Sequence, residues 1–151
     1  MISIITIGKK HENWVCQGIE RYQQRLQRPR DVKWSIIAHS AFDGTRARQD
    51  ESKRILSRLN SRDFVIVLDE RGKLLDSPAL AQSIDQAFAD SRPLVFIIGG
   101  AYGVTDEVRE RADLVWSLSP LVFPHQLVRL ILVEQLYRAQ EISRGGKYHH
   151  G

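Results

Sequence analysis

The five histidines are the side chains whose ordinary pKa lies nearest to neutral pH. They are His11, His39 and His125, which are far apart in the sequence, and the adjacent pair His149 and His150. A histidine titrates near neutral pH and can act as a general base. The histidines and the single Cys16 lack the spacing of metal ligands, so we expect no metal site. Two plainer interpretations stay open: His125 as an ordinary first-turn residue, and the tail as a frayed end or a tag remnant.

A second candidate is the glycine-rich segment at residues 99–103, Gly-Gly-Ala-Tyr-Gly, which follows an apolar run. Gly99 and Gly100 would let a ligand approach the backbone without interference from side chains. Taken alone, a tight turn between a strand and a helix is the favoured interpretation. The segment matches neither G-x-G-x-x-G nor the P-loop, so it gives little support to a nicotinamide oxidoreductase or a nucleotide phosphate site.

Short apolar runs alternate with amphipathic segments along the whole chain. The pattern predicts strands at residues 2–7, 32–38, 64–68, 94–98 and 114–118, and helices at 11–27, 48–59, 77–90, 105–112 and 124–142. This alternation is typical of an α/β domain with a mostly parallel sheet. Such sheets bind ligands at the carboxyl ends of their strands, so we expect the site in the loops after Leu68, Ile98 and Leu118. Residues 69–76 are predicted to be a loop.

The composition indicates one ordinary globular domain over residues 1–151, which we expect in the cytoplasm because a single cysteine suits a reducing compartment. We expect no signal peptide and no membrane span. The net charge of +4 is uneven: residues 1–62 hold 13 Lys or Arg against 6 Asp or Glu. This excess could mark an RNA surface, although a solvated face is favoured on charge alone, and no basic motif interleaved with aromatic residues is present.

The predicted helix at 124–142 is apolar on more than one stripe, with Pro124 suited to its first position. A surface helix would show one apolar face, so a second subunit is expected to cover part of this one. Leu132 is taken as a member that faces outward. Arg129 and Glu134 interrupt the apolar zone, and charges there usually have a partner or a role.

Several blocks, in this order, resemble the ribosomal RNA large subunit methyltransferase H family, which belongs to the SPOUT methyltransferases. They are Ile-Gly-Lys at residues 7–9, Val-Leu-Asp-Glu-Arg-Gly-Lys at 67–73, Phe-Ile-Ile-Gly-Gly-Ala-Tyr-Gly at 96–103, Trp-Ser-Leu-Ser at 116–119, Phe-Pro-His-Gln-Leu-Val-Arg at 123–129, Glu-Gln-Leu-Tyr-Arg at 134–138 and Tyr-His at 148–149. The resemblance covers essentially the whole chain. Any single block would be weak, whereas the combination and order are specific.

The resemblance implies an enzyme that transfers a methyl group from S-adenosylmethionine to N3 of a pseudouridine in 23S rRNA. It also implies a C-terminal trefoil knot and a homodimer. The cofactor would be bound by a set of loop residues: Leu68, Gly99, Gly100, Leu118, Ser119, Pro120, Leu121, Val122 and Phe123. Because one small domain has no separate RNA-reading module, we expect the substrate to be 23S rRNA in the assembled ribosome. The alternative is a non-catalytic ribosome- or RNA-binding module.

Within this family resemblance, the tail is expected to act on the substrate. His149 is the candidate base for the N3 proton, and Tyr148 could stack on the target base. His125 and Arg129 would position the tail, a phosphate or the cofactor carboxylate. Relatives often carry Arg or Lys after the Tyr-His pair, whereas His150 and Gly151 follow it here.

Overall fold

The computed structural model describes residues 1–150, so Gly151 lies outside the described part. Five strands and five helices alternate: β1 Ile2–Ile7, α1 Asn13–Gln23, β2 Val32–Ile37, α2 Gly44–Leu56, β3 Phe64–Leu74, α3 Ser77–Ala89, β4 Leu94–Ile98, α4 Asp106–Arg111, β5 Leu114–Ser117 and α5 His125–Ser143. The sheet has the order β2-β1-β4-β3-β5, and every pair of neighbours is parallel. The predicted α/β class is therefore confirmed, while the trefoil knot stays a prediction.

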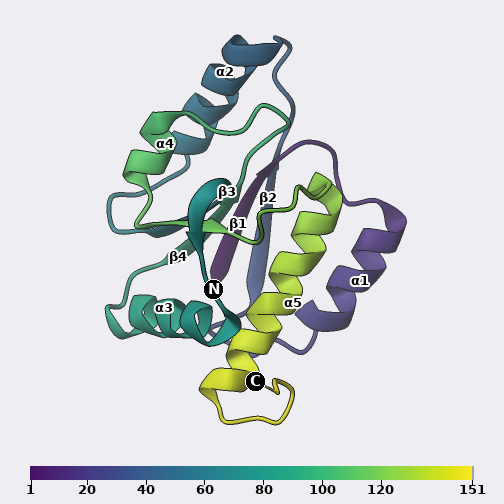
Figure 1. Cartoon of the computed structure of the whole chain (residues 1–151), viewed down its shortest axis with the longest axis vertical. Coiled ribbons are helices and arrows are strands. Elements are labelled where there is room, and N and C mark those ends of the chain that lie inside the picture. Colours follow the sequence, from purple (N-terminus) through teal and green to yellow (C-terminus); the bar gives the residue numbers. More distant parts are fainter. Residues whose placement is uncertain (151) are drawn as a thin grey trace.

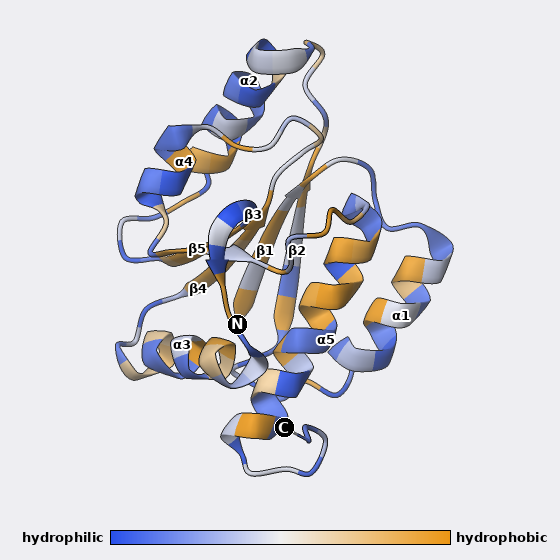
Figure 2. Ribbon diagram, in the orientation of Figure 1, coloured by the Kyte–Doolittle hydropathy of each residue, from blue (hydrophilic) through white to orange (hydrophobic). Residues whose placement is uncertain are grey.

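Helices cover both faces of the sheet, which gives three layers (Figure 1). On one face α1, α3 and α5 pack against Ile4, Phe96 and Trp116. On the other face α2 and α4 contribute Ile55 and Val108 to a second apolar cluster. Figure 2 shows the central strands as mostly hydrophobic, whereas α2 is hydrophilic along most of its length. Burial on two sides explains why the strands are continuously apolar and lack strict alternation.

Helix ends differ from the predicted ones because local hydrogen bonds decide them. The cap of α3 is Asp76, whose carboxylate accepts a hydrogen bond from the Ala79 N–H at 2.9 Å, and Ser77 is the first helical residue. Pro124, with φ −58° and ψ 143°, is the cap of α5 and not its first residue. The helix therefore begins at His125, one residue later than predicted. The predicted helix at 48–59 begins earlier, at Gly44.

The predicted loop at 69–76 is wrong for most of its length, because β3 continues to Leu74. The pairing with β5 shifts register between Leu68 and Lys73, so the intervening residues form an irregular stretch. Gly72 lies against the neighbouring backbone there: a Cβ on Gly72 would stand 2.6 Å from the carbonyl carbon of Val115. Only glycine fits this approach, so the irregularity depends on that residue.

Helix α5 packs its central residues inside the domain and leaves others partly exposed. Leu132 is fully buried in the core, so its prediction as an outward member is wrong. Ile131 and Gln135 lie on the partly exposed side of the helix. Across residues 1–150, none of the helices has both the length and the apolar character that crossing a bilayer demands.

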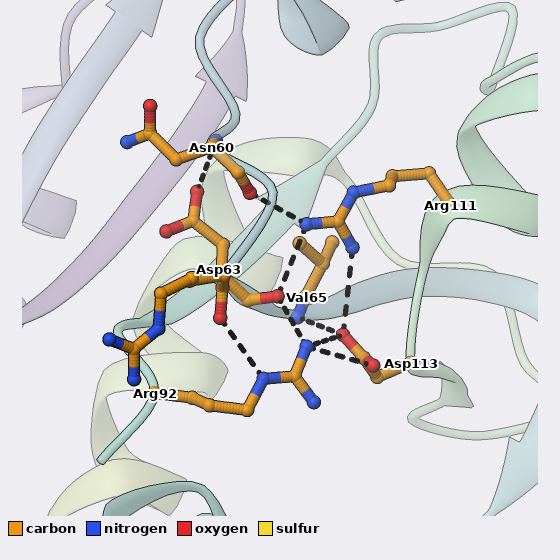
Figure 3. Close-up of polar contacts among 7 residues, drawn as sticks. Asn60, Asp63, Val65, Arg92, Arg111 and Asp113 are labelled. Carbon is orange, nitrogen blue, oxygen red and sulfur yellow. Dashed lines mark hydrogen bonds and ion pairs between the residues drawn. The ribbon is translucent and has the colours of Figure 1, made fainter.

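The amino edge of the sheet is tied together by a polar network (Figure 3). One carboxylate oxygen of Asp113 accepts from the Val65 N–H at 2.8 Å and pairs with Arg92 at 3.0 Å and Arg111 at 3.6 Å. Both arginines also donate to the Asp63 carbonyl, at 2.7 and 3.1 Å. The network joins the segments that lead into β3, β4 and β5, and it lies away from the carboxyl edge where a ligand is expected.

This network predicts that Asp113→Ala lowers the free energy of unfolding by about 1–3 kcal/mol, because the buried Val65 N–H loses its acceptor and two arginines lose their partner. Urea unfolding measures the change. Glu110→Ala is the matched control, since Glu110 is exposed and lies three residues away. Equal effects of the two substitutions would show that the network does not stabilise the amino edge.

Candidate functional site

A cavity of about 340 Å³ opens at the carboxyl edge of the sheet. Its walls come from the irregular stretch of β3, the loop after β4, the loop after β5 and the first turns of α5. They include Leu68, Asp69, Gly99, Leu118, Phe123 and His125. Parallel strands bring these loops together although they are far apart in the sequence. The volume lies within the range of small-molecule sites.

Most of the residues predicted to bind a cofactor line this one cavity. Eight of them do so: Leu68, Gly99, Gly100, Leu118, Ser119, Leu121, Val122 and Phe123. Pro120 does not line the cavity, and its side chain is exposed. His125, predicted as a catalytic or positioning residue, lies in the wall. The segments after Leu68, Ile98 and Leu118 therefore converge as expected, although the first of them is the irregular stretch of β3 and not a loop.

Two apolar side chains on the rim have no cover within the described chain. Leu121 is 69% exposed and Val122 is 81% exposed, although each is aliphatic. Their loop is held by short local hydrogen bonds: Leu121 N–H donates to the Ser119 hydroxyl at 3.0 Å, and the Ser117 hydroxyl donates to the Ser119 carbonyl at 3.1 Å. Adjacent exposed apolar groups at the mouth of a cavity are typical of a binding surface.

The glycines of residues 99–103 are required by the loop itself as well as by close approach of a ligand. A Cβ on Gly99 would stand 2.9 Å from Val104 Cγ1, and one on Gly100 would stand 2.6 Å from a carboxylate oxygen of Glu51. Gly103 has φ +75° and donates its N–H to the Gly100 carbonyl at 3.0 Å. A larger residue at Gly99 would therefore disturb the loop before it filled the cavity.

The side chains of Asp69 and Arg109 form an ion pair within the cavity wall, which the sequence analysis did not single out. Their closest N–O distance is 3.1 Å, and Arg109 also donates to the Val104 carbonyl at 2.8 Å. Hydrogen bonding to Asp106, with the contribution of Asp69, raises the pKa of Arg109. This pair fixes the irregular part of β3 against the loop after β4. Its only sequence signal was the acidic residue after the apolar run of β3.

The surroundings of His125 favour the neutral form of its ring. Partial desolvation lowers its pKa from 6.5, and the charge of Arg129 acts in the same direction, although the Gly99 backbone opposes them. From its place in the cavity wall, His125 can donate to or accept from a ligand.

Arg129 lies outside the cavity and under the loop between β1 and α1. Its side chain is 1% exposed, donates to the Lys9 carbonyl at 2.7 Å and lies 3.3 Å from Nδ1 of His11. Since arginine can only donate, His11 Nδ1 is the acceptor. Burial lowers the pKa of Arg129, and the described chain gives it no carboxylate partner within 4 Å. Arg129 therefore positions the loop between β1 and α1, and its predicted role toward the tail, a phosphate or the cofactor carboxylate stays a prediction.

The tail folds back on the second half of α5. Arg138 pairs with Glu134 at 2.6 Å and lies 3.0 Å from Nδ1 of His149. The Tyr148 hydroxyl donates to Glu134 at 3.3 Å, and its ring lies 4.8 Å from that of Tyr137. Burial, together with the Glu134 carboxylate, raises the pKa of Tyr148 to about 12. Glu134, noted in the sequence as a charge within the apolar zone, and Arg138 therefore anchor the tail.

The tail lies beside a second hollow, which shares two wall residues with the cavity. His149 lines a separate hollow of about 520 Å³ together with Ser77, Trp116, Ile131 and other residues. Leu118 and Phe123 line both spaces and separate them. Among residues 1–150, no group of three His, Cys, Asp or Glu side chains is arranged to hold a metal ion.

A cavity with this lining at the carboxyl edge of a parallel sheet defines an α/β protein with a small-molecule site. The sequence profile of one family, described as "Predicted SPOUT methyltransferase", matches residues 1–149. The chain belongs to this family and is a methyltransferase.

Similar proteins from three bacteria carry the name Ribosomal RNA large subunit methyltransferase H. The protein of Bacillus pumilus (strain SAFR-032) is 42% identical over 156 residues, with 98% of each chain covered. That of Desulfitobacterium hafniense (strain DSM 10664 / DCB-2) is 40% identical, also with 98% of each chain covered. That of Syntrophotalea carbinolica (strain DSM 2380 / NBRC 103641 / GraBd1) is 39% identical, with 99% of this chain and 98% of the relative covered.

Proposed function

We propose that this methyltransferase uses S-adenosylmethionine to methylate ribosomal RNA of the large subunit, at N3 of a pseudouridine in 23S rRNA. The observation that carries the proposal is the single cavity lined by eight of the nine residues expected to bind the cofactor. The names of the similar proteins support the RNA substrate. A non-catalytic RNA-binding module is not favoured, because the chain belongs to a methyltransferase family. We further propose that it works in the cytoplasm, where ribosomes are found.

The residues of the cavity fit the proposed cofactor chemically. Leu118, Leu121 and Phe123 provide an apolar slot for a planar base, and the glycine loop provides backbone close to the ligand. When bound, S-adenosylmethionine would supply an electrophilic methyl group on a sulfonium. The protein's own contribution is to align that group with the acceptor nitrogen and to exclude water.

The proposed role of the tail follows from the bond between Arg138 and His149. Because Arg138 donates to Nδ1, the neutral His149 ring carries its proton on Nε2 and acts as a donor in this arrangement. We infer that His149 orders the target base through a carbonyl oxygen. To accept the N3 proton at Nδ1, the ring would have to leave Arg138. Tyr148, with its raised pKa, would remain a neutral stacking surface.

If S-adenosylmethionine binds in this cavity, Leu121→Asp should lower its affinity. Leu121 is exposed, so the substitution should leave the fold intact, while an apolar contact is replaced by a charge beside the adenine slot. We expect at least about tenfold weaker binding of S-adenosylmethionine in titration calorimetry. Leu74→Asp is the matched control, because Leu74 is 57% exposed and lies outside the cavity. Equal affinities of wild type and Leu121→Asp for S-adenosylmethionine would show that the cofactor binds elsewhere.

We propose a homodimer through the partly exposed side of α5. The separate hollow contains the apolar side chains of Leu75, Leu118, Phe123 and Ile131, and a second copy would cover them. Ile131→Glu should therefore give a monomer of 17.3 kDa by light scattering, whereas wild type should have twice that mass. Gln82→Glu, an exposed change on α3, should remain dimeric. A wild-type monomer at micromolar concentration would contradict the proposal.

The substrate proposal predicts methylation of assembled ribosomes that lack the mark, with little or no methylation of the isolated 23S hairpin. One small domain has to rely on phosphates and the target base in one fixed geometry, because phosphate contacts position without specifying sequence. Tritium transfer from labelled S-adenosylmethionine measures both substrates. Equal labelling of free hairpin and ribosome would refute this view of specificity.

The proposed role of His149 predicts that His149→Ala lowers methyl transfer to the ribosome by about 10²-fold or more at unchanged cofactor affinity.

A further inference from the structure

The segment that leads from β1 into α1 exposes two lysines and a tryptophan close together in the chain. Lys9 and Lys10 are exposed, and neither takes part in an ion pair among the described residues. Trp14, in the first turn of α1, is 53% exposed. Three other residues separate Lys10 from Trp14, so the segment does not read as a basic motif interleaved with aromatic residues.

This segment is held in place by hydrogen bonds from α5. Arg129 donates to the Lys9 carbonyl at 2.7 Å, and Gln126 accepts from the Glu12 N–H at 3.0 Å. Gln126 also donates to the Lys10 carbonyl, at 3.4 Å. Burying an arginine without a carboxylate partner is costly, and its hydrogen bonds to this loop offset part of that cost. The loop is therefore a preorganised surface.

Hydrogen bonding also fixes the orientation of the exposed indole. Trp14 Nε1 donates to a carboxylate oxygen of Glu12 at 2.7 Å. This bond accounts for the acidic residue beside the lysines, because Glu12 holds the ring and pairs with no cation in the described chain. An aromatic ring held in one orientation loses little entropy when a base stacks on it.

The segment lies beside the cavity at the same edge of the sheet. Strand β1 is the neighbour of β4, and a Cβ on Gly100 would stand 3.1 Å from Ile7 Cγ2. In α5, His125 and Val128 line the cavity, whereas Gln126 and Arg129 hold the segment. Figure 1 shows the connection from β1 to α1 beside the end of α5 where that helix begins. A nucleic acid with its target base at the cavity could also touch this segment.

We propose that residues 9–14 form an RNA-contact element, in which Lys9 and Lys10 bind backbone phosphates and Trp14 stacks on an unpaired base next to the target. The inference rests on the proposed function and deepens it by naming a contact surface for the substrate. Lysines supply the salt-dependent phosphate contacts, and an exposed indole supplies stacking that any base can accept. Single-stranded loops of folded RNA offer both groups within a short distance.

The test measures binding to ribosomes that lack the methyl mark, over a series of salt concentrations. The double variant Lys9→Ala/Lys10→Ala should bind at least about tenfold more weakly. The magnitude of the negative slope of log affinity against log salt concentration should decrease by about 1.4–1.8. Trp14→Ala should weaken binding about 5- to 100-fold with an unchanged slope. Lys33→Ala/Lys53→Ala is the matched control, since both lysines are exposed elsewhere, and it should retain the wild-type affinity.

Three results would overturn the inference. The first is a wild-type affinity and salt slope in the lysine double variant. The second is loss of S-adenosylmethionine binding in that variant, which would tie the loop to the cavity instead of to RNA. The third is a monomeric Trp14→Ala protein with unchanged ribosome affinity, which would assign the indole to a contact between copies. Failure of the proposed function is distinguishable, because it appears as absent methyl transfer in the wild-type protein.

Discussion

Parallel pairing throughout the sheet is the constraint on which the rest of this structure depends. Helices cover both faces of the sheet and bury its central strands β1 and β4, so the connecting loops gather at the two edges where the strands begin and end. The amino and carboxyl edges of the sheet differ in structure. At the amino edge the network around Asp113 ties together the entries of three strands, whereas at the carboxyl edge the loops leave a cavity. The polar network and the cavity therefore lie at opposite ends of the same strands.

Two arginines of α5 act in the same way toward separate parts of the chain. Arg129 donates to Nδ1 of His11 near the beginning of the helix, and Arg138 donates to Nδ1 of His149 further along it. In both cases the donor selects the tautomer of the neutral ring, with the proton on Nε2. The last helix thus positions a loop on one side and the tail on the other. The charges that interrupt its apolar stripes in the sequence serve this purpose.

The residues of the cavity could be named from the sequence largely because a family resemblance supplied them. Bottom-up reasoning located the loops after three strands, but it favoured a simple turn for Gly99 and Gly100 and core packing for the apolar run at 118–123. Exposure rules out core packing for Leu121 and Val122, which are among the most exposed apolar residues. Exposure depends on what packs nearby, and that information is absent from a local pattern.

Hydrophobic periodicity is a local property of the chain, and it was enough to predict the α/β alternation, the buried strands and the edge where the cavity lies. The face that Leu132 takes, the extent of β3 and the partners of Arg129 and Arg138 became apparent only from tertiary contacts. Leu132 turns inward because the sheet covers that stripe of α5, and β3 continues because Gly72 admits the backbone of β5. Each of these outcomes depends on contacts between residues distant in the sequence, and no short window of the chain contains both partners.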